Sequence, residues 1–298
     1  MPALLAAPDD LPAARRLARR LGPDWVVDVL PTAPDAQTLL ARIRDLGHDT
    51  VVALTDLPLG TDRRPLQAVG DGRVVVVSLP ALGATGQVRR AHRLLAELAE
   101  ADEVVEVAAR RVLGRLRLLA GLVRENRPWR LATGMVGALA AGVSTAAFGL
   151  LSSTPWQLGM ALTPWRLTLI TVGAILTMVL FLVFGHGLWE RGDEVVREHV
   201  RLYNATTLLT LTFGVLVLYA VGFAIVLPVV LLVLDPDVVR ANVGTRPDFS
   251  DYVAIAWFIA SMATVGGALG SALESDEAVR RAAYGERQRA RVDGAVDT

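Results

Sequence analysis

The segment from Leu167 to Leu188, LTLITVGAILTMVLFLVFGHGL, contains no Asp, Glu, Arg or Lys. An α-helix rises about 1.5 Å per residue, so about 20 such residues cross the roughly 30 Å hydrocarbon core of a bilayer. Three more runs of this kind occur in the chain: Leu131–Leu151, Leu208–Leu234 and Tyr252–Leu273. Four uncharged runs are very unusual in a soluble core, so the sequence predicts an all-α bundle of four transmembrane helices over residues 131–273.

The run Leu208–Leu234 is longer than a single crossing needs. As one helix it would extend about 40 Å, and Pro228 would remove one backbone hydrogen bond near its end. A re-entrant turn at Pro228 is the alternative, but each half would then be too short to cross. The sequence therefore favours one kinked span.

The distribution of Arg predicts the orientation in the membrane. All 30 basic side chains are Arg, since the chain has no Lys, and 30 acidic side chains balance them. Near the predicted helix ends, most Arg residues fall in three segments: 103–130, 189–204 and 273–298. The alternate connections contain only Arg166, Arg240 and Arg246. Because basic residues favour the cytoplasmic side, we expect a multi-pass protein of the plasma membrane with both termini in the cytoplasm.

Small residues recur every four positions in the first and fourth runs. The positions that would allow the closest approach of two backbones are Gly134, Ala138, Gly142, Gly266 and Gly270. Such faces let helices associate in lipid, which offers no hydrophobic drive for association. The sequence favours packing of these two helices within one chain, surrounded by the lipid bilayer. A homo-oligomer formed through the same face is the alternative.

Residues 1–102 have the alternating pattern of a small α/β domain. The predicted strands are Ala3–Ala7, Trp25–Leu30, Thr50–Leu54 and Arg73–Leu79. The predicted helices are Leu11–Leu21, Ala33–Leu46 and Gln87–Ala101. Strands that alternate with helices favour a parallel sheet, so we expect a Rossmann-like cytosolic domain ahead of the bundle.

Polar residues at the ends of the predicted strands form a candidate ligand-binding site. A parallel sheet binds ligands at the carboxyl ends of its strands, and two neighbouring Arg could hold a phosphate or carboxylate there. The candidate residues are Asp9, Asp56, Arg63, Arg64, Ser78 and Gly83. The alternative is that Asp56 and Arg64 organise a loop and that Ser78–Gly83 is a turn leading to a helix.

The segment 103–130 joins the α/β domain to the predicted transmembrane helices. Its pattern predicts an amphipathic, Arg-rich linker helix. It could lie on the anionic inner leaflet or pack on the domain as a stalk. In either case we expect it to transmit a conformational change from the domain to the spans. Residues 274–298 predict a polar cytosolic tail.

Motifs for enzymatic chemistry are largely missing from the sequence. The chain has no Cys, no GxGxxG after its first strand, no GxxxxGK[ST], no HExxH and no GxSxG. His186 and Glu190 are four residues apart, a spacing that could bind a metal, but surface ion pairing explains the surrounding charges equally well. The sequence therefore predicts no catalytic residue, and we expect no cofactor and no nucleic-acid partner.

Four segments resemble a known family: LTDLP at residues 54–58, Arg64-Pro65, SLPALG at 78–83 and RLYNATT at 201–207. The family comprises uncharacterised four-span membrane proteins of high-GC Gram-positive bacteria with an N-terminal α/β domain. Members are sometimes labelled methylenetetrahydrofolate dehydrogenase. The sequence does not support that label, because it has neither a nucleotide-binding glycine loop nor a catalytic Lys.

Two classes of function fit these features. The first is a non-enzymatic membrane module whose cytosolic α/β domain binds a ligand or partner and is coupled to the membrane bundle. The second is a small channel or transporter regulated by that domain, with hydroxyl groups such as those of Thr171 and Thr210 lining a path. The alternative for these hydroxyls is bonding to their own helix carbonyls.

Overall fold

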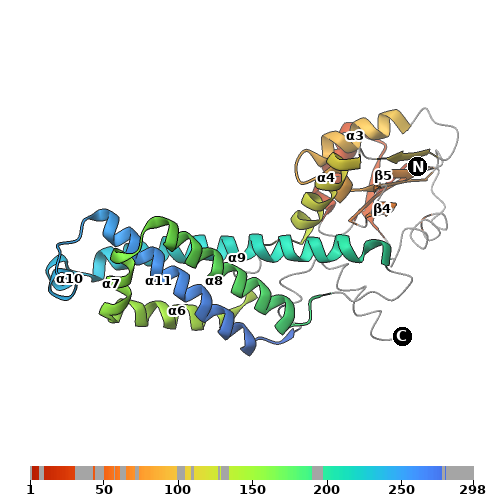
Figure 1. Ribbon diagram of the computed structural model, residues 1–298. Helices are drawn as coiled ribbons and strands as arrows, with labels where there is room; N and C mark the ends of the chain where they lie inside the picture. Colours follow the sequence, from red (N-terminus) through yellow and green to blue (C-terminus); the bar gives the residue numbers. More distant parts are fainter. Residues whose placement is uncertain are drawn as a thin grey trace. The chain divides into compact units, whose positions relative to one another are not determined.

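The computed structural model divides the chain into two compact units (Figure 1). The structure describes residues 2–6, 10–30, 43, 50–56, 58–60, 65–70, 74–98, 105–108, 111–126, 128, 134–189, 197–276 and 279. The first unit comprises Met1–Asn126, Arg191–Thr206 and Gly285–Thr298, and the second comprises Arg127–Glu190 and Thr207–Tyr284.

The first unit is built on one mixed β-sheet. Its strands are β1 (Ala3–Ala6), β2 (Val26–Val29), β3 (Val51–Thr55), β4 (Leu59–Gly60), β5 (Pro65–Gly70), β6 (Val74–Ser78) and β7 (Val105–Ala108). The order is β2-β1-β3-β6-β5-β4, and β7 also pairs with β5. The pairs β2-β1, β1-β3 and β3-β6 are parallel, as predicted, whereas β4, β5 and β7 pair antiparallel.

The prediction of a wholly parallel sheet is therefore wrong for half of the sheet. Strand β5 lies between the predicted strands Thr50–Leu54 and Arg73–Leu79, where the sequence predicts no strand. It ends at Gly70 and β6 begins at Val74, a connection far shorter than the dozen or more residues that a parallel crossover needs. The two strands must consequently form a hairpin.

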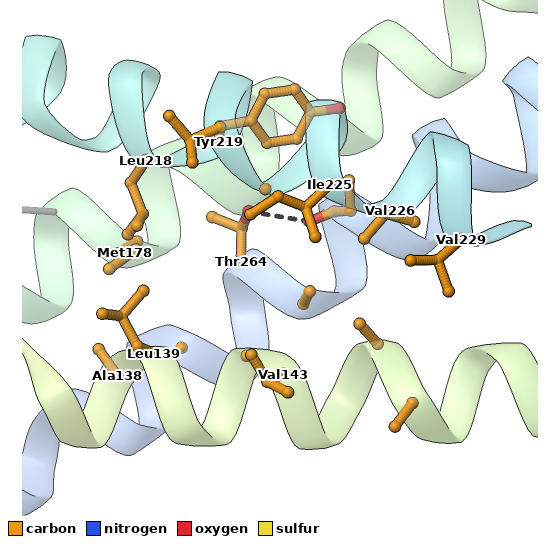
Figure 2. A pocket seen from close by; sticks show the side chains of 18 of the residues that line it. Ala138, Leu139, Val143, Met178, Leu218, Tyr219, Ile225, Val226, Val229 and Thr264 are labelled. Atoms are coloured by element: carbon orange, nitrogen blue, oxygen red, sulfur yellow. Dashed lines mark hydrogen bonds between the residues drawn. The ribbon is translucent and has the colours of Figure 1, made fainter.

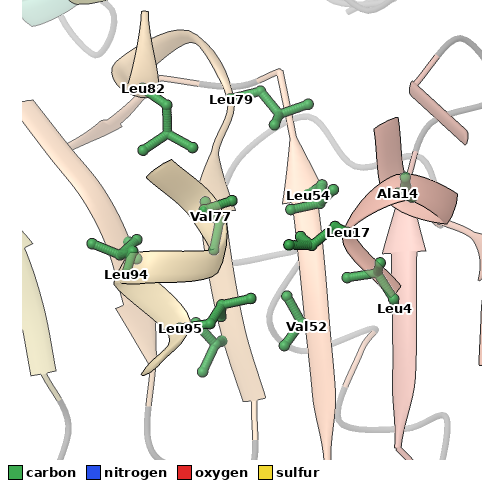
Figure 3. Close-up of a cluster of buried hydrophobic side chains, with 14 of the residues drawn as sticks. Leu4, Ala14, Leu17, Val52, Leu54, Val77, Leu79, Leu82, Leu94 and Leu95 are labelled. Atoms are coloured by element: carbon green, nitrogen blue, oxygen red, sulfur yellow. The ribbon is translucent and has the colours of Figure 1, made fainter. Parts of the chain in front are cut away.

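Two helices cover one face of this sheet. They are α1 (Leu11–Leu21) and α3 (Gln87–Leu98). Leu17 of α1 and Leu94 of α3 pack on Leu4, Leu54 and Val77 of the parallel strands (Figure 3). Strands β3 and β6 are buried along their whole length, which explains their continuous Val and Leu composition.

The linker segment differs from the predicted single helix. Residues 105–108 form strand β7, and helix α4 extends only from Arg111 to Glu125. Helix α4 packs on the short 3₁₀ helix η2 (Pro80–Leu82), with Leu118 and Leu122 against Ala81. The α/β unit thus extends past the predicted boundary at residue 102, and α4 packs on the domain as a stalk would.

The second unit is almost entirely helical. Its helices are α6 (Val136–Leu151), α7 (Ser153–Ala161), α8 (Pro164–Gly185), most of α9 (Arg197–Val233), α10 (Pro236–Val243) and α11 (Phe249–Gly270), with η4 (Ser271–Leu273). Three segments are long and apolar enough to cross a membrane: Pro164–Gly185, Val200–Val233 and Phe249–Leu273.

The first predicted span needs correction. Helix α6 has 16 residues, about 24 Å, which is too short to cross alone. It continues into α7 after a bend of 85°, and the two together form at most one broken span. Among the residues that the structure describes, there are therefore three membrane-length helices, or four if the bent pair counts as one span. Ser152 interrupts the helix with extended backbone at φ −112° and ψ 131°.

Helix α9 is one continuous element that includes Pro228. The membrane-length part, Val200–Val233, extends about 50 Å. The preference for a single span over a re-entrant turn is confirmed. The helix also starts at Arg197, well before the apolar run that begins at Leu208.

The predicted packing of the first and fourth spans within one chain is confirmed. A Cβ added to Gly267 would lie 3.1 Å from the carbonyl oxygen of Ala138, and one on Gly142 would lie 3.2 Å from that of Ala263. Helices α6 and α11 thus approach through Ala138 and Gly142, which the sequence analysis names, and through Ala263 and Gly267, which it does not. Gly134, in contrast, is exposed.

The variant Gly270→Ala tests the close packing of α6 against α11. Its Cβ would lie 2.6 Å from the carbonyl oxygen of Gly137 and would also meet the Ala141 side chain, so the helices must separate. We expect a loss of about 1–3 kcal/mol in the free energy of unfolding, measured in mixed micelles. Gly173→Ala is the control, because nothing lies within 4 Å of its added Cβ. Equal stability of the two variants would contradict the packing described.

Candidate functional site

The structure describes three of the six predicted ligand-binding residues. Asp9, Arg63 and Arg64 lie outside the described residues, as does Glu190 of the weak metal candidate. Thr55 and Ser78 are register partners on the parallel strands β3 and β6, and Asp56 follows Thr55 directly. Asp56 and Ser78 therefore lie at the same carboxyl edge of the sheet.

The backbone around Ser78 has the geometry of a turn. The amide of Leu79 donates to the carbonyl oxygen of Thr55 at 2.8 Å, and the buried Ser78 Oγ accepts from the amide of Ala81 at 3.4 Å. Gly83 ends η2 at φ 93°, a conformation that favours glycine. These bonds are those of the turn that the sequence analysis considered as the alternative to a ligand site.

A positively charged cavity of about 500 Å³ lies in the same unit, and the sequence analysis missed it. It is bordered by one face of α1, the start of α3 and the end of α4. Its lining comprises Ala13, Arg16, Arg19, Arg20, Gly86, Gln87, Val88, Arg89 and Arg124. The repeated Arg pairs of RRLARR at residues 15–20 were the available signal. Helix α1 buries Leu17 and Ala18, which leaves these Arg pairs on its solvent side.

A group of four polar side chains lies among the membrane-length helices of the second unit. Thr171 Oγ1 of α8 accepts from Trp257 Nε1 of α11 at 2.7 Å and lies 2.9 Å from Ser261 Oγ. Tyr219 OH of α9 lies 3.4 Å from both hydroxyl groups. Thr171 therefore joins residues of three helices. Inside an apolar bundle, this network fixes the relative position of those helices.

Five other threonine hydroxyls of the apolar helices bond locally. Each donates to the carbonyl oxygen four residues earlier, as expected for hydroxyls in packed helices: Thr145, Thr168, Thr177, Thr206 and Thr264. Thr171 also makes this bond, to Leu167. These hydroxyl groups therefore bond to carbonyl oxygens of their own helices, which is the alternative to lining a channel.

An apolar cavity of about 270 Å³ separates α6 from α9, with α11 behind it (Figure 2). Leu139 of α6 and Leu218 and Ile225 of α9 point into it, and Met178 of α8 contributes to one end. Its lining includes no Asp, Glu, Arg or His. The lining is mainly apolar, and its polar side chains are those of Tyr219 and Thr264.

His186 is buried at the end of α8, where both ring nitrogens bond within the protein. Nε2 lies 3.1 Å from the carbonyl oxygen of Ser271, which can only accept, so Nε2 carries a proton. Nδ1 lies 2.8 Å from Oδ1 of Asp276. Glu274, two residues before Asp276, accepts from the amide of Gly137 at the start of α6. The segment after α11 therefore ties the ends of α6 and α8 together.

The geometry of His186 is that of a structural residue. With both nitrogens in hydrogen bonds, the ring offers no lone pair to a metal without rearrangement. Within the part of the chain that the structure describes, no group of three His, Asp or Glu is placed to hold an ion. The bond to Ser271 and the contact with Asp276 instead position the C-terminal segment.

Comparisons with known proteins assign no family to this geometry. No family model, no curated protein and no solved structure matches the chain. Function is therefore inferred from the contacts and charges of the described residues.

The variant Thr171→Val tests the polar network. It removes the acceptor of the Trp257 indole and the partner of Ser261, so we expect a loss of about 1–2 kcal/mol in the free energy of unfolding in micelles. Thr177→Val is the matched control, because exposed Thr177 bonds only to its own helix at Gly173. A Thr171→Val protein as stable as the control would show that the network does not hold the helices.

Proposed function

We propose that this protein is a non-enzymatic membrane module in which the α/β unit binds a ligand and passes its state to the membrane helices through α9. The proposal includes membership of the four-span family that the sequence resembles and a place in the plasma membrane. Three to four membrane-length helices support the membrane part. The observation that carries the coupling is the contact of Leu202, near the start of α9, with the core of the α/β unit.

A series of contacts leads from the strand-end region to α9. Strand β6 ends at Ser78, and η2 follows it directly. Ala81 of η2 packs with Leu118 and Leu122 of α4, and the same cluster contains Leu202 of α9. From Leu202 the helix continues without a break to Val233. A ligand that moves the turn after β6 would therefore act on the first part of a membrane-length helix.

The joint between α4 and η2 is close enough to transmit a small displacement. A Cβ on Gly121 would overlap the main chain of Pro80, with its Cα only 2.5 Å away. The two backbones are therefore in direct contact, and little side-chain rearrangement can absorb a movement of η2. A ligand changes the equilibrium only if it binds one arrangement of this joint more tightly than the other.

The connection between α9 and α11 supports the proposed topology. Asp235 caps α10, and Asp248 forms a capping box with Asp251 at the start of α11. The hydroxyl of Ser250, and then the amide of Asp251, lower the pKa of Asp248, so this exposed carboxylate remains ionised at neutral pH. An ionised capping carboxylate is stable where water solvates it, so this connection lies outside the hydrocarbon core of the membrane. With few Arg nearby, we place this connection outside the cell and both termini in the cytoplasm.

A channel or transporter is the weaker proposal. The hydroxyl groups of Thr171, Thr177 and Thr264 bond to carbonyl oxygens of their own helices, and Thr171 also belongs to the polar network. The cavity beside α6 is lined by apolar groups. Both observations favour helix packing over a path for ions or polar solutes.

Cysteine labelling tests the topology, and the chain has no native Cys to interfere. We expect Asp237→Cys, exposed on α10, to react with a membrane-impermeant maleimide in intact cells. Glu97→Cys, equally an exposed acid but on α3, should react only after lysis. The reverse pattern of labelling would refute the proposed orientation.

A spin label on α9 tests the coupling. We place it at Leu216→Cys, an exposed position in the membrane-length part, in full-length protein in lipid nanodiscs. Gly121→Ala and, independently, Leu202→Ala should change the mobility of the label, because each disturbs the contact of α9 with the α/β unit. Ala120→Ser, exposed on the same helix as Gly121, is the control. An unchanged spectrum in both variants, with α-helical content retained, would rule out transmission through α9.

A further inference from the structure

The cavity between α1 and α3 concentrates positive charge. Five Arg side chains border it, Arg16, Arg19, Arg20, Arg89 and Arg124, and its lining includes no acidic residue. Guanidinium groups remain protonated in proteins, so this group of side chains attracts anions. Around 500 Å³ is the size of a small-molecule site and is larger than one phosphate group requires.

Several of these cations have no partner in the part of the chain that the structure describes. Arg19 bonds to the carbonyl oxygen of Arg15, and Arg124 bonds to that of Ala84. Arg16, Arg20 and Arg89 have neither a hydrogen bond nor an ion pair there. Their side chains are exposed, so their guanidinium groups are accessible to a ligand.

The start of α3 adds hydrogen-bond donors to the same cavity. The first intrahelical bond is donated by Arg90, to the carbonyl oxygen of Gly86. The amides of Gln87, Val88 and Arg89 precede it and border the cavity, and amides at this position have no acceptor within the helix. An anion bound there would also meet the positive end of the helix dipole.

We propose that this arginine cavity binds a ligand carrying two or more phosphate groups. Guanidinium groups bind phosphate oxygens in bidentate fashion, and five of them suit a polyanion better than a single carboxylate. The phosphates belong either to a soluble polyphosphate or to the headgroups of anionic lipids. This inference rests on the proposed function and names the ligand class of its α/β unit.

The cavity is connected to the contacts that lead to α9. Gln87, which borders it, donates from Nε2 to the carbonyl oxygen of Leu79 and to Oε1 of Glu125, each at 3.2 Å. Leu79 immediately precedes η2, and Glu125 is the last residue of α4. A polyanion at the start of α3 would therefore act on the joint between η2 and α4.

Direct binding measurements on the full-length protein in zwitterionic micelles test the proposal. One arm uses inorganic tripolyphosphate as the probe, and the other uses a soluble short-chain cardiolipin, a lipid whose headgroup carries two phosphate groups. The double variant Arg16→Gln/Arg89→Gln should raise the dissociation constant at least about tenfold, because charge-assisted hydrogen bonds are lost. The matched control Arg15→Gln/Arg93→Gln changes the same charge on the same two helices outside the cavity. It should change the constant less than about twofold.

Each outcome decides the proposal. Tripolyphosphate binding that depends on the cavity residues supports a soluble ligand, and lipid binding with the same dependence supports a headgroup. No binding of either probe, or equal weakening by the two double variants, would overturn the proposal. Binding is measured without reference to α9, so a failure here is distinct from a failure of the spin-label test of coupling.

Discussion

Close approach of α6 and α11 is the constraint on which the second unit depends. Lipid gives helices no hydrophobic reason to associate, so contact must come from backbones that can touch. Gly142, Gly267 and Gly270 provide this, because each faces a carbonyl oxygen of the partner helix. Helix α11 also contacts α8 through the network around Thr171 and α9 through Tyr252, whose hydroxyl donates to the carbonyl oxygen of Leu234. The arrangement thus centres on α11.

Composition and periodicity are sufficient to predict the three membrane-length helices and the parallel part of the sheet. The uncharged runs at α8, α9 and α11 and the buried Val-rich strands β3 and β6 are local signals that need no knowledge of neighbours. Strand β5 was missed because PLQAVG alternates weakly and depends on pairing with β6 and β7. The break at Ser152 was missed because composition alone cannot locate a bend inside an apolar run.

The candidate sites differ in how far sequence could predict them. The strand pattern alone predicts that Asp56 and Ser78 lie at the same sheet edge, since the carboxyl ends of parallel strands meet there. The arginine cavity combines α1, α3 and α4, whose residues are far apart in the chain. Taken alone, each Arg pair is typical of the solvent-exposed face of an ordinary surface helix. Only the packing of α1 beside α3 brings Arg16 and Arg89 to one cavity.

The position of Leu202 has a consequence for biosynthesis. Its cluster partners Ala81, Leu118 and Leu122 leave the ribosome well before it does, and α6, α7 and α8 are made in between. Domains generally fold as units in the order of synthesis, but this unit stays incomplete until the chain beyond α8 has emerged. Its hydrophobic docking surface is therefore exposed while the first membrane segments insert. Completion of the Leu202 cluster therefore has to wait for residues that are synthesised after α6, α7 and α8.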